Sequence, residues 1–238
     1  KTFFSLRKKN EFFKRFQNYE KWINRSDSDI SEFEYQSGAN YAPYFDKHLK
    51  KIKNENLNFL EIGTGSGHAV ASFYFYLPFA KFYCIDKKPE SMFMYSSKRI
   101  FYKSLNIYDN QKVKNYLMLN NSFDFILEDS DHNQESILTN FKNFYPRLNN
   151  NGIYCIKGFS SQDNFLKHVF EFNNKNNTKV FYPVENNTIK EIFDCVKEKT
   201  FFENSIIDKK FLENLYTFNN EINFYYTGHP AGGLLFLK

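Results

Sequence analysis

Glycines at alternate positions, preceded by a glutamate, form the most distinctive pattern in the sequence, Glu61-Ile62-Gly63-Thr64-Gly65-Ser66-Gly67. The pattern lies between a short apolar run at 58–62, which predicts a buried strand, and a helical pattern at 67–77. Glycine lets the backbone turn sharply and approach a ligand closely. Asp86 ends the next predicted strand, where a carboxylate is placed to accept hydrogen bonds from ribose hydroxyls. The spacing predicts a nucleotide-like ligand at the ends of these strands.

Two ligands and a structural turn compete for this loop. A dinucleotide would place its pyrophosphate at the helix N-terminus, but the negative charge of Glu61 would repel it and suits a cationic or amino-bearing ligand. With Asp86, the Glu-x-Gly-x-Gly-x-Gly pattern resembles the S-adenosylmethionine (SAM) site of class I methyltransferases. Ser104 and Glu128, which end the third and fourth predicted strands, are candidates by position alone. The predicted cofactor-binding residues are therefore Glu61, Gly63, Gly65, Asp86, Ser104 and Glu128.

A second polar stretch, Asp129-Ser130-Asp131-His132, follows the predicted strand at 123–128. Asp129 and His132 are three residues apart and can share one face where a helix begins. A neutral His132 can take a proton from a sugar or phenol hydroxyl as that oxygen attacks the SAM methyl group. Asp129 can orient the imidazole or hold a cation. The alternative is structural, with Asp129 capping the following helix and His132 merely exposed.

This region resembles the macrolide-sugar O-methyltransferases of the macrocin and mycinamicin type. Those enzymes carry an Asp-Gly-Ser-His motif before a helix that ends in Phe-Pro-x-Leu-x-x-Gly-Gly. The matching residues here are Asp129 to His132, then Phe144-Tyr145-Pro146-Arg147-Leu148 and Gly152, and the resemblance spans roughly residues 35–160. It implies that His132 is the general base and that Asp129 binds magnesium.

The chain departs from that family where the family places two further acidic metal ligands, at the end of the fifth strand. Lys157-Gly158 stands there, and a protonated lysine repels a hard cation. Either the ion is lost, with Lys157 replacing its charge in lowering the pKa of the substrate hydroxyl, or Asp131 and Glu128 compensate as ligands. We therefore predict His132, Asp129 and Lys157 as catalytic residues, SAM as cofactor, and Asp129 as the one candidate magnesium ligand.

Two other functions stay open. Asp129 and Lys157 are similar to half of the Lys-Asp-Lys-Glu tetrad of ribose 2′-O-methyltransferases that act on RNA. The altered metal ligands also fit a catalytically inactive SAM-binding partner protein. The expected reaction remains O-methylation of a hydroxyl on a sugar or other small metabolite.

Strand and helix patterns alternate along the chain, which predicts a Rossmann-like α/β fold. We expect a three-layer sandwich with a mostly parallel seven-stranded sheet, an N-terminal helical extension at 1–35 and a class I methyltransferase domain at 36–238. The predicted strands are 58–62, 81–86, 99–102, 123–128, 153–156, 222–227 and 233–237. Further helices are expected at 89–97, 110–117, 133–148, 161–172, 188–198 and 208–217, with a turn at 149–152.

The composition is that of an ordinary globular protein, with 42% hydrophobic and 25% charged residues among 238. The net charge of +5 is spread along the chain, so we expect no nucleic-acid partner. No run reaches the roughly 18–20 apolar residues that a membrane span needs, so we expect no membrane partner. The three cysteines lack metal-binding spacing and favour a reducing, cytoplasmic location. The expected partner is a small, sugar-like substrate, and a homo-oligomer stays open.

Overall fold

The computed structural model describes the parts of the chain that build and surround the predicted site. The described residues are 42–65, 67–88, 97–119, 122–131, 133–157, 193–194, 197–198, 210, 222–226 and 233–237. The predicted extension at 1–35, the helix at 161–172 and nearly all of the predicted helices at 89–97, 188–198 and 208–217 lie outside them, as do Ser66 and His132. In the described part, no helix is long and apolar enough to cross a membrane.

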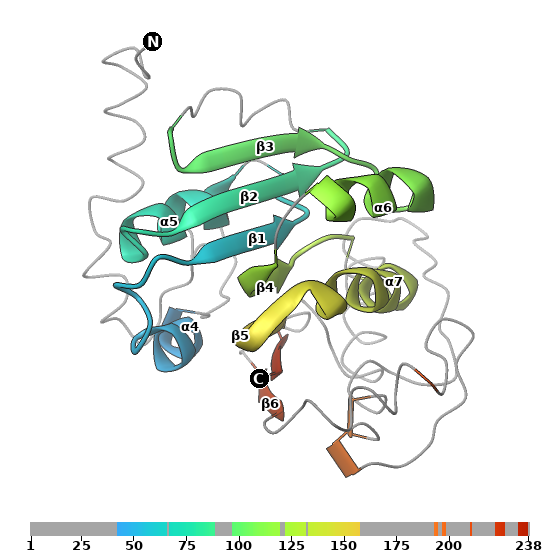
Figure 1. Cartoon of the computed structure of the whole chain (residues 1–238). Coiled ribbons are helices and arrows are strands. Elements are labelled where there is room, and N and C mark those ends of the chain that lie inside the picture. The colour runs from blue at the N-terminus through green and yellow to red at the C-terminus, as the bar shows by residue number, and fades with distance from the viewer. Residues whose placement is uncertain are drawn as a thin grey trace, which may run out of the picture.

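A seven-stranded sheet in the order β3-β2-β1-β4-β5-β7-β6 forms the centre of the fold (Figure 1). Strands β1 to β5 are parallel to one another, and β7 runs antiparallel to both β5 and β6. This is the mostly parallel sheet that the sequence predicts. The strands are β1 (Asn58–Ile62), β2 (Lys81–Asp86), β3 (Ile100–Ser104), β4 (Phe123–Glu128), β5 (Leu148–Lys157), β6 (Ile222–Tyr226) and β7 (Gly233–Leu237).

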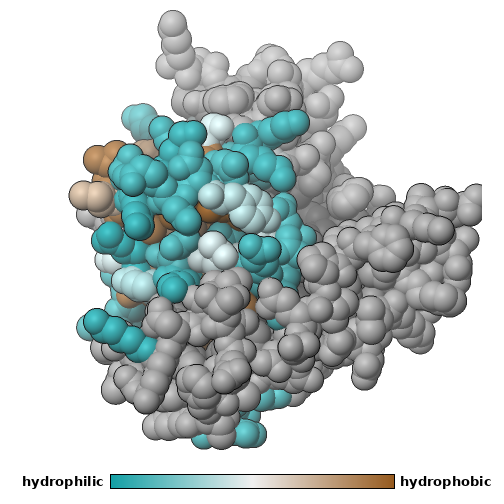
Figure 2. All heavy atoms as spheres, turned by 90° about the vertical axis from the view of Figure 1, so that its right-hand side faces the viewer, coloured by the Kyte–Doolittle hydropathy of each residue, from teal (hydrophilic) through white to brown (hydrophobic). Residues whose placement is uncertain are grey.

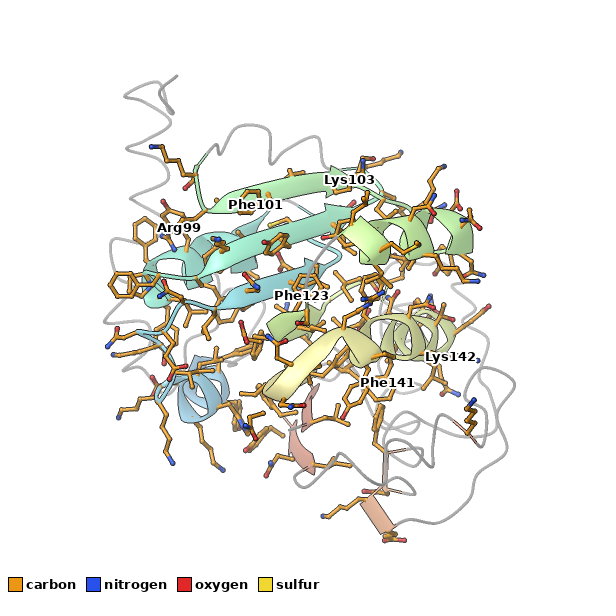
Figure 3. All side chains as sticks on the ribbon, in the orientation of Figure 1. Arg99, Phe101, Lys103, Phe123, Phe141 and Lys142 are labelled. Carbon is orange, nitrogen blue, oxygen red and sulfur yellow. The ribbon has the colours of Figure 1, made fainter. Side chains whose placement is uncertain are left out.

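Helices cover the sheet on both faces, which explains why the central strands β1 and β4 are buried along nearly their whole length. One buried cluster joins the sheet to α6 (Asn110–Leu119) and α7 (Gln134–Phe144), and it contains Phe123 and Phe141, both labelled in Figure 3. The other joins it to α4 (Ala42–Leu49) and α5 (His68–Tyr76). The predicted three-layer sandwich is therefore confirmed.

Arg99 ties the edge of the sheet to the end of α5 (Figure 3). Its guanidinium donates hydrogen bonds to the carbonyl oxygens of Tyr74, Leu77 and Ala80, at 2.9–3.0 Å. The guanidinium carbon also lies 3.7 Å from the centre of the Tyr74 ring. Helix carbonyls at a C-terminus lack partners within the helix, so a planar cation with several donors is well suited to this position.

The structure corrects the sequence prediction between α7 and β5. The helix ends at Phe144 instead of 148, and a 3₁₀ turn follows at Tyr145–Arg147. Strand β5 already begins at Leu148 and includes residues 149–152, for which a turn was predicted. Pro146 cannot continue an α-helix because it lacks a backbone N–H. The start of β5 is irregular, with a register shift against β4 and a positive φ of 63° at Asn151. Turn-forming residues thus occupy an irregular strand.

Candidate active site

The glycine loop between β1 and α5 adopts the backbone conformation that its composition predicts. Gly63, Gly65 and Gly67 have φ angles of 86°, 49° and 77°, in the left-handed region that favours glycine. The backbone N–H groups of Gly63 and Thr64 donate to the carbonyl oxygen of Ile85, at 2.9 and 3.2 Å. These bonds hold the loop against the end of β2, where Asp86 lies.

Gly63 and Gly65 serve different purposes within this loop. A Cβ atom at Gly63 would lie 2.3 Å from the carbonyl oxygen of Asp129 and 2.6 Å from the Cα of Ser130. The Asp129 N–H also donates to the carbonyl oxygen of Ile62, at 2.9 Å. Gly63 therefore allows the loops after β1 and β4 to touch. A Cβ at Gly65 would meet no atom within 4 Å, so this glycine borders open space.

A cavity of about 280 Å³ lies beside these two loops. The arrowheads of β1, β2 and β3 point to the right in Figure 1, and Figure 2 shows that the described surface viewed from that side is mostly hydrophilic. Parallel α/β sheets bind ligands at the carboxyl ends of their strands. The cavity brings together four of the predicted residues, Gly63, Gly65, Asp86 and Asp129. Its full lining is Gly63, Gly65, Asp86, Lys87, Leu105, Ile107, Tyr108, Asp129, Ser130 and Asp131.

Asp86 is fixed by backbone donors on both carboxylate oxygens. Its Oδ2 accepts from the Gly65 N–H and its Oδ1 from the Lys88 N–H, each at 2.8 Å. A carboxylate can accept about four hydrogen bonds, so these contacts orient Asp86 and leave capacity for two ribose hydroxyls. The structure thus places Asp86 at the cavity wall in the position predicted for a nucleoside ligand.

Glu61 is buried inside the sheet, with 1% of its surface exposed. Burial, followed by the negative charge of Asp129, raises the pKa of the Glu61 carboxyl well above its usual range. Its Oε2 has no hydrogen-bond partner among the described residues. Burial disfavours the ionised form of this group, because an unpaired buried carboxylate is costly. A ligand ammonium group near the loop would favour its ionisation.

Glu128 and Ser104 do not line the cavity, although the sequence predicts cofactor contacts for both. Glu128 is fully buried, and its Oε1 accepts hydrogen bonds from the Ser130 hydroxyl and from the Asn140 side chain on α7. Ser104 is exposed and donates to the carbonyl oxygen of Lys87, at 3.4 Å. Both residues hold neighbours that do line the cavity, Ser130 and Lys87. A strand-end position indicates the correct edge of the sheet but not the direction of a side chain.

Asp129 and Lys157 meet at the ends of the neighbouring parallel strands β4 and β5. The Lys157 Nζ lies 3.0 Å from the Asp129 Oδ2, and the two side chains are 6% and 13% exposed. The N-cap of α7 is Asn133, whose side chain accepts from the Ser136 N–H, at 2.8 Å. The interpretation of Asp129 as the helix cap is therefore wrong. The third predicted catalytic residue, His132, lies outside the described residues.

Three cavity residues that the sequence analysis did not assign to the cofactor site bridge separate loops. The Tyr108 hydroxyl donates to the Asp131 Oδ2 at 2.8 Å, and the Lys87 Nζ lies 3.7 Å from the Asp131 Oδ1. These residues follow the ends of β3, β4 and β2. In the sequence, only their position close after a predicted strand could have indicated them, and many residues outside the cavity share that feature.

The residues present do not fit the magnesium ion that the sequence resemblance implies. Magnesium prefers near-octahedral coordination by oxygen ligands and needs carboxylates that are not already paired with a cation. Within the described ranges, no three His, Cys, Asp or Glu side chains are grouped to hold a metal. The carboxylate of Asp129 contacts an ammonium group instead.

The strand order with antiparallel β7, the glycine loop after β1 and the acidic residue after β2 together define the class I SAM-dependent methyltransferase fold. The chain has this fold.

Comparison with solved structures agrees with this assignment. The MycE methyltransferase of the mycinamycin biosynthetic pathway, in complex with Mg and SAH, superposes with a TM-score of 0.60 at 15% identity, over 83% of this chain and 49% of that one. The same values hold for its complex with Mg, SAH and mycinamycin VI. A second crystal form gives a TM-score of 0.58 at 15% identity, over 89% and 53%. The chain thus spans about half the length of MycE. No protein-family profile matches the sequence, and no curated protein matches it.

Proposed function

We propose that this protein is a SAM-dependent O-methyltransferase that acts on a hydroxyl of a sugar or other small metabolite. The observation that carries the proposal is the cavity in which Gly65 and the anchored Asp86 lie together with Asp129. The class I fold supports it, because this fold places cofactor and acceptor at the carboxyl edge of the sheet.

The lining of the cavity suits SAM in charge and polarity. Asp86, Asp129 and Asp131 contribute three carboxylates, against the two lysines Lys157 and Lys87 that pair with Asp129 and Asp131, and this excess of negative charge favours a ligand that carries a sulfonium and an ammonium group. Leu105 and Ile107 offer apolar surface to an adenine ring. Asp86 would accept hydrogen bonds from the ribose. The open space at Gly65 would let the cofactor approach the backbone of the loop.

The bound cofactor would supply an electrophilic methyl group on a sulfonium. The acceptor oxygen would bond to this methyl carbon, and the electron pair of the broken carbon–sulfur bond would stay on sulfur. The hydroxyl proton passes to the imidazole of His132, the base that the sequence predicts. Asp129 orients the acceptor or the imidazole, and Lys157 fixes the Asp129 carboxylate. Alignment of oxygen and methyl carbon accounts for much of the rate in such a transfer.

The Asp129–Lys157 contact also keeps the ribose 2′-O-methyltransferase alternative open. The three carboxylates in the cavity wall outnumber the two lysines paired with them, which disfavours a polyanionic acceptor, so a small neutral metabolite is preferred. Phosphate contacts weaken steeply with salt. Binding of a short RNA that falls by orders of magnitude between low and moderate salt would favour the alternative.

Titration calorimetry with SAM and SAH tests the proposal first. We expect micromolar binding by the wild type. Asp86→Ala should bind at least about tenfold more weakly, because a charged hydrogen-bonding group is removed. Asp109→Ala should bind with the affinity of the wild type. Asp109 is the control, since it pairs with Lys112 and is not itself one of the residues that line the cavity. Absence of SAM and SAH binding by the wild type would refute the proposed function.

Turnover then separates an enzyme from an inactive SAM-binding protein. Wild type and His132→Ala are incubated with methyl-labelled SAM and a panel of hydroxylated sugars and phenols. We expect labelled product from the wild type, and loss of product from His132→Ala with SAH affinity retained. A wild type that binds SAM but labels no acceptor in the panel would favour the partner-protein alternative.

A further inference from the structure

Buried charges are few in the described part of the chain, and one of them is a cation. Glu61, Glu128 and Lys157 are its buried charged residues, on the neighbouring strands β1, β4 and β5. A buried ammonium requires a partner of opposite charge, because burial removes it from water. The Asp129 carboxylate is such a partner, at 3.0 Å. Asp129 also lines the cavity, so the pair lies at the wall of the proposed active site.

The position of the pair is the place where the sequence resemblance puts magnesium. A divalent cation coordinated by Asp129 would lie within a few ångströms of the Lys157 ammonium, where the two like charges repel strongly at reduced dielectric. Moving Lys157 aside would expose a side chain that is packed with 6% of its surface accessible. In the part of the chain that the structure describes, no three His, Cys, Asp or Glu side chains are grouped so that they could hold the ion in another way.

We propose that the Lys157 ammonium takes the place of a divalent cation beside Asp129, so that the active site excludes such cations and methyl transfer proceeds without one. The exclusion of cations stands on the ion pair alone, and the statement about methyl transfer rests on the proposed function. Lys157 is then a positioning residue, since it acts through the carboxylate that it neutralises. The transfer balances without a metal, because the oxygen gains the methyl carbon, sulfur keeps the electron pair of the broken bond and His132 takes the proton.

Manganese binding measured by electron paramagnetic resonance tests the exclusion directly, since the hydrated free ion gives the signal and the bound ion does not. The proteins are wild type, Asp129→Asn, Lys157→Glu, the double variant and Lys103→Glu. Lys103 is exposed on β3 and labelled in Figure 3, so Lys103→Glu introduces the same change of charge away from the pair. Calorimetry with SAH and thermal denaturation report whether each variant is folded.

We expect the wild type, Asp129→Asn and Lys103→Glu to bind manganese equally weakly. Lys157→Glu places a second carboxylate beside Asp129, so its affinity should rise by at least about tenfold and fall again in the double variant. Manganese binding by the wild type that Asp129→Asn loses would overturn the inference. A folded Lys157→Glu variant with no gain in manganese affinity would overturn the inference as well. If that variant does not fold, the manganese affinities of the wild type and Asp129→Asn decide whether the inference holds.

The activity arm uses EDTA. Transfer to any acceptor found in the panel should change by less than about twofold with EDTA or added magnesium, because no step needs a cation. A loss of about tenfold that magnesium restores would overturn the inference, while leaving the proposed function intact. Failure of the wild type to bind SAH would refute the proposed function, and the manganese experiment would still test the exclusion.

Discussion

Gly63→Ala tests whether the loops after β1 and β4 must touch for the site to form. The new Cβ would lie 2.3 Å from the Asp129 carbonyl oxygen, 2.6 Å from the Ser130 Cα and 2.8 Å from the Asp129 carbonyl carbon. All three atoms belong to the backbone, so no side-chain rotation can relieve the contact. The residue would also carry a φ of 86°, which L-amino acids rarely adopt.

Two costs add in this variant. A left-handed backbone costs about 1–2 kcal/mol for a residue with a Cβ, and overpacking against a fixed neighbour costs about 1–3 kcal/mol. Together they lower the free energy of unfolding by about 2–5 kcal/mol. A domain of this size loses about 2–4 °C in Tm per kcal/mol, so the Tm should fall by about 4–20 °C.

Gly65→Ala is the matched control, since its φ is also positive but its Cβ would meet nothing within 4 Å. Gly65→Ala should lower the free energy of unfolding only by the cost of the left-handed backbone, about 1–2 kcal/mol. Both variants reduce the entropy of the unfolded chain in the same way, so this effect cancels when they are compared. Thermal denaturation followed by circular dichroism compares the stabilities, and calorimetry with SAH compares the sites. We expect Gly65→Ala to remain folded but to bind SAH more weakly, because its methyl group enters the space beside Asp86. A Gly63→Ala protein as stable as Gly65→Ala would refute the reasoning.

Three further predictions concern buried or anchored groups. Because the pKa of Glu61 is raised in the folded state, the folded protein keeps a proton there at pH values where the unfolded chain has lost it. The free energy of unfolding therefore decreases as the pH rises from the unfolded pKa of about 4.3 toward the folded pKa. Glu61→Gln should flatten the dependence of Tm on pH in this range, and parallel curves for the two proteins would contradict it. Asn140→Ala removes a hydrogen-bond donor that lies 3.0 Å from the buried Glu128 carboxylate, and it should lower the free energy of unfolding in urea by about 1–3 kcal/mol. An unchanged urea midpoint would show that this hydrogen bond does not stabilise the fold. Arg99→Met removes three hydrogen bonds at the end of α5 and should cost at least about 1.5–3 kcal/mol, with faster amide exchange there. Arg99→Lys should not restore protection, because a lysine lacks the planar fork, and full restoration would show that charge alone suffices.

The strands and helices, and the edge of the sheet where the cavity lies, could be predicted from residues that are close together in the chain. Apolar runs separated by helical patterns are local signals, and they placed β1, β2 and β4 at their observed bounds. The left-handed glycines of the loop and the carboxylate at Asp86 could also be predicted, since glycine at such positions and an acid at a strand end act through their own backbone surroundings. Strand-end residues come to one edge because the strands are parallel.

Which of those strand-end residues face the cavity depends on the packing of the folded chain. Glu128 ends β4 one position before Asp129, yet it points into the core toward Asn140, while Asp129 lines the cavity and pairs with Lys157. The contact that requires Gly63 is likewise made with the backbone after β4, from a distant part of the chain. Side-chain direction, burial and ion pairing depend on the register of neighbouring strands and on the helices packed over them. Such non-local contacts exist only after the sheet has assembled, and no local pattern of residues specifies them.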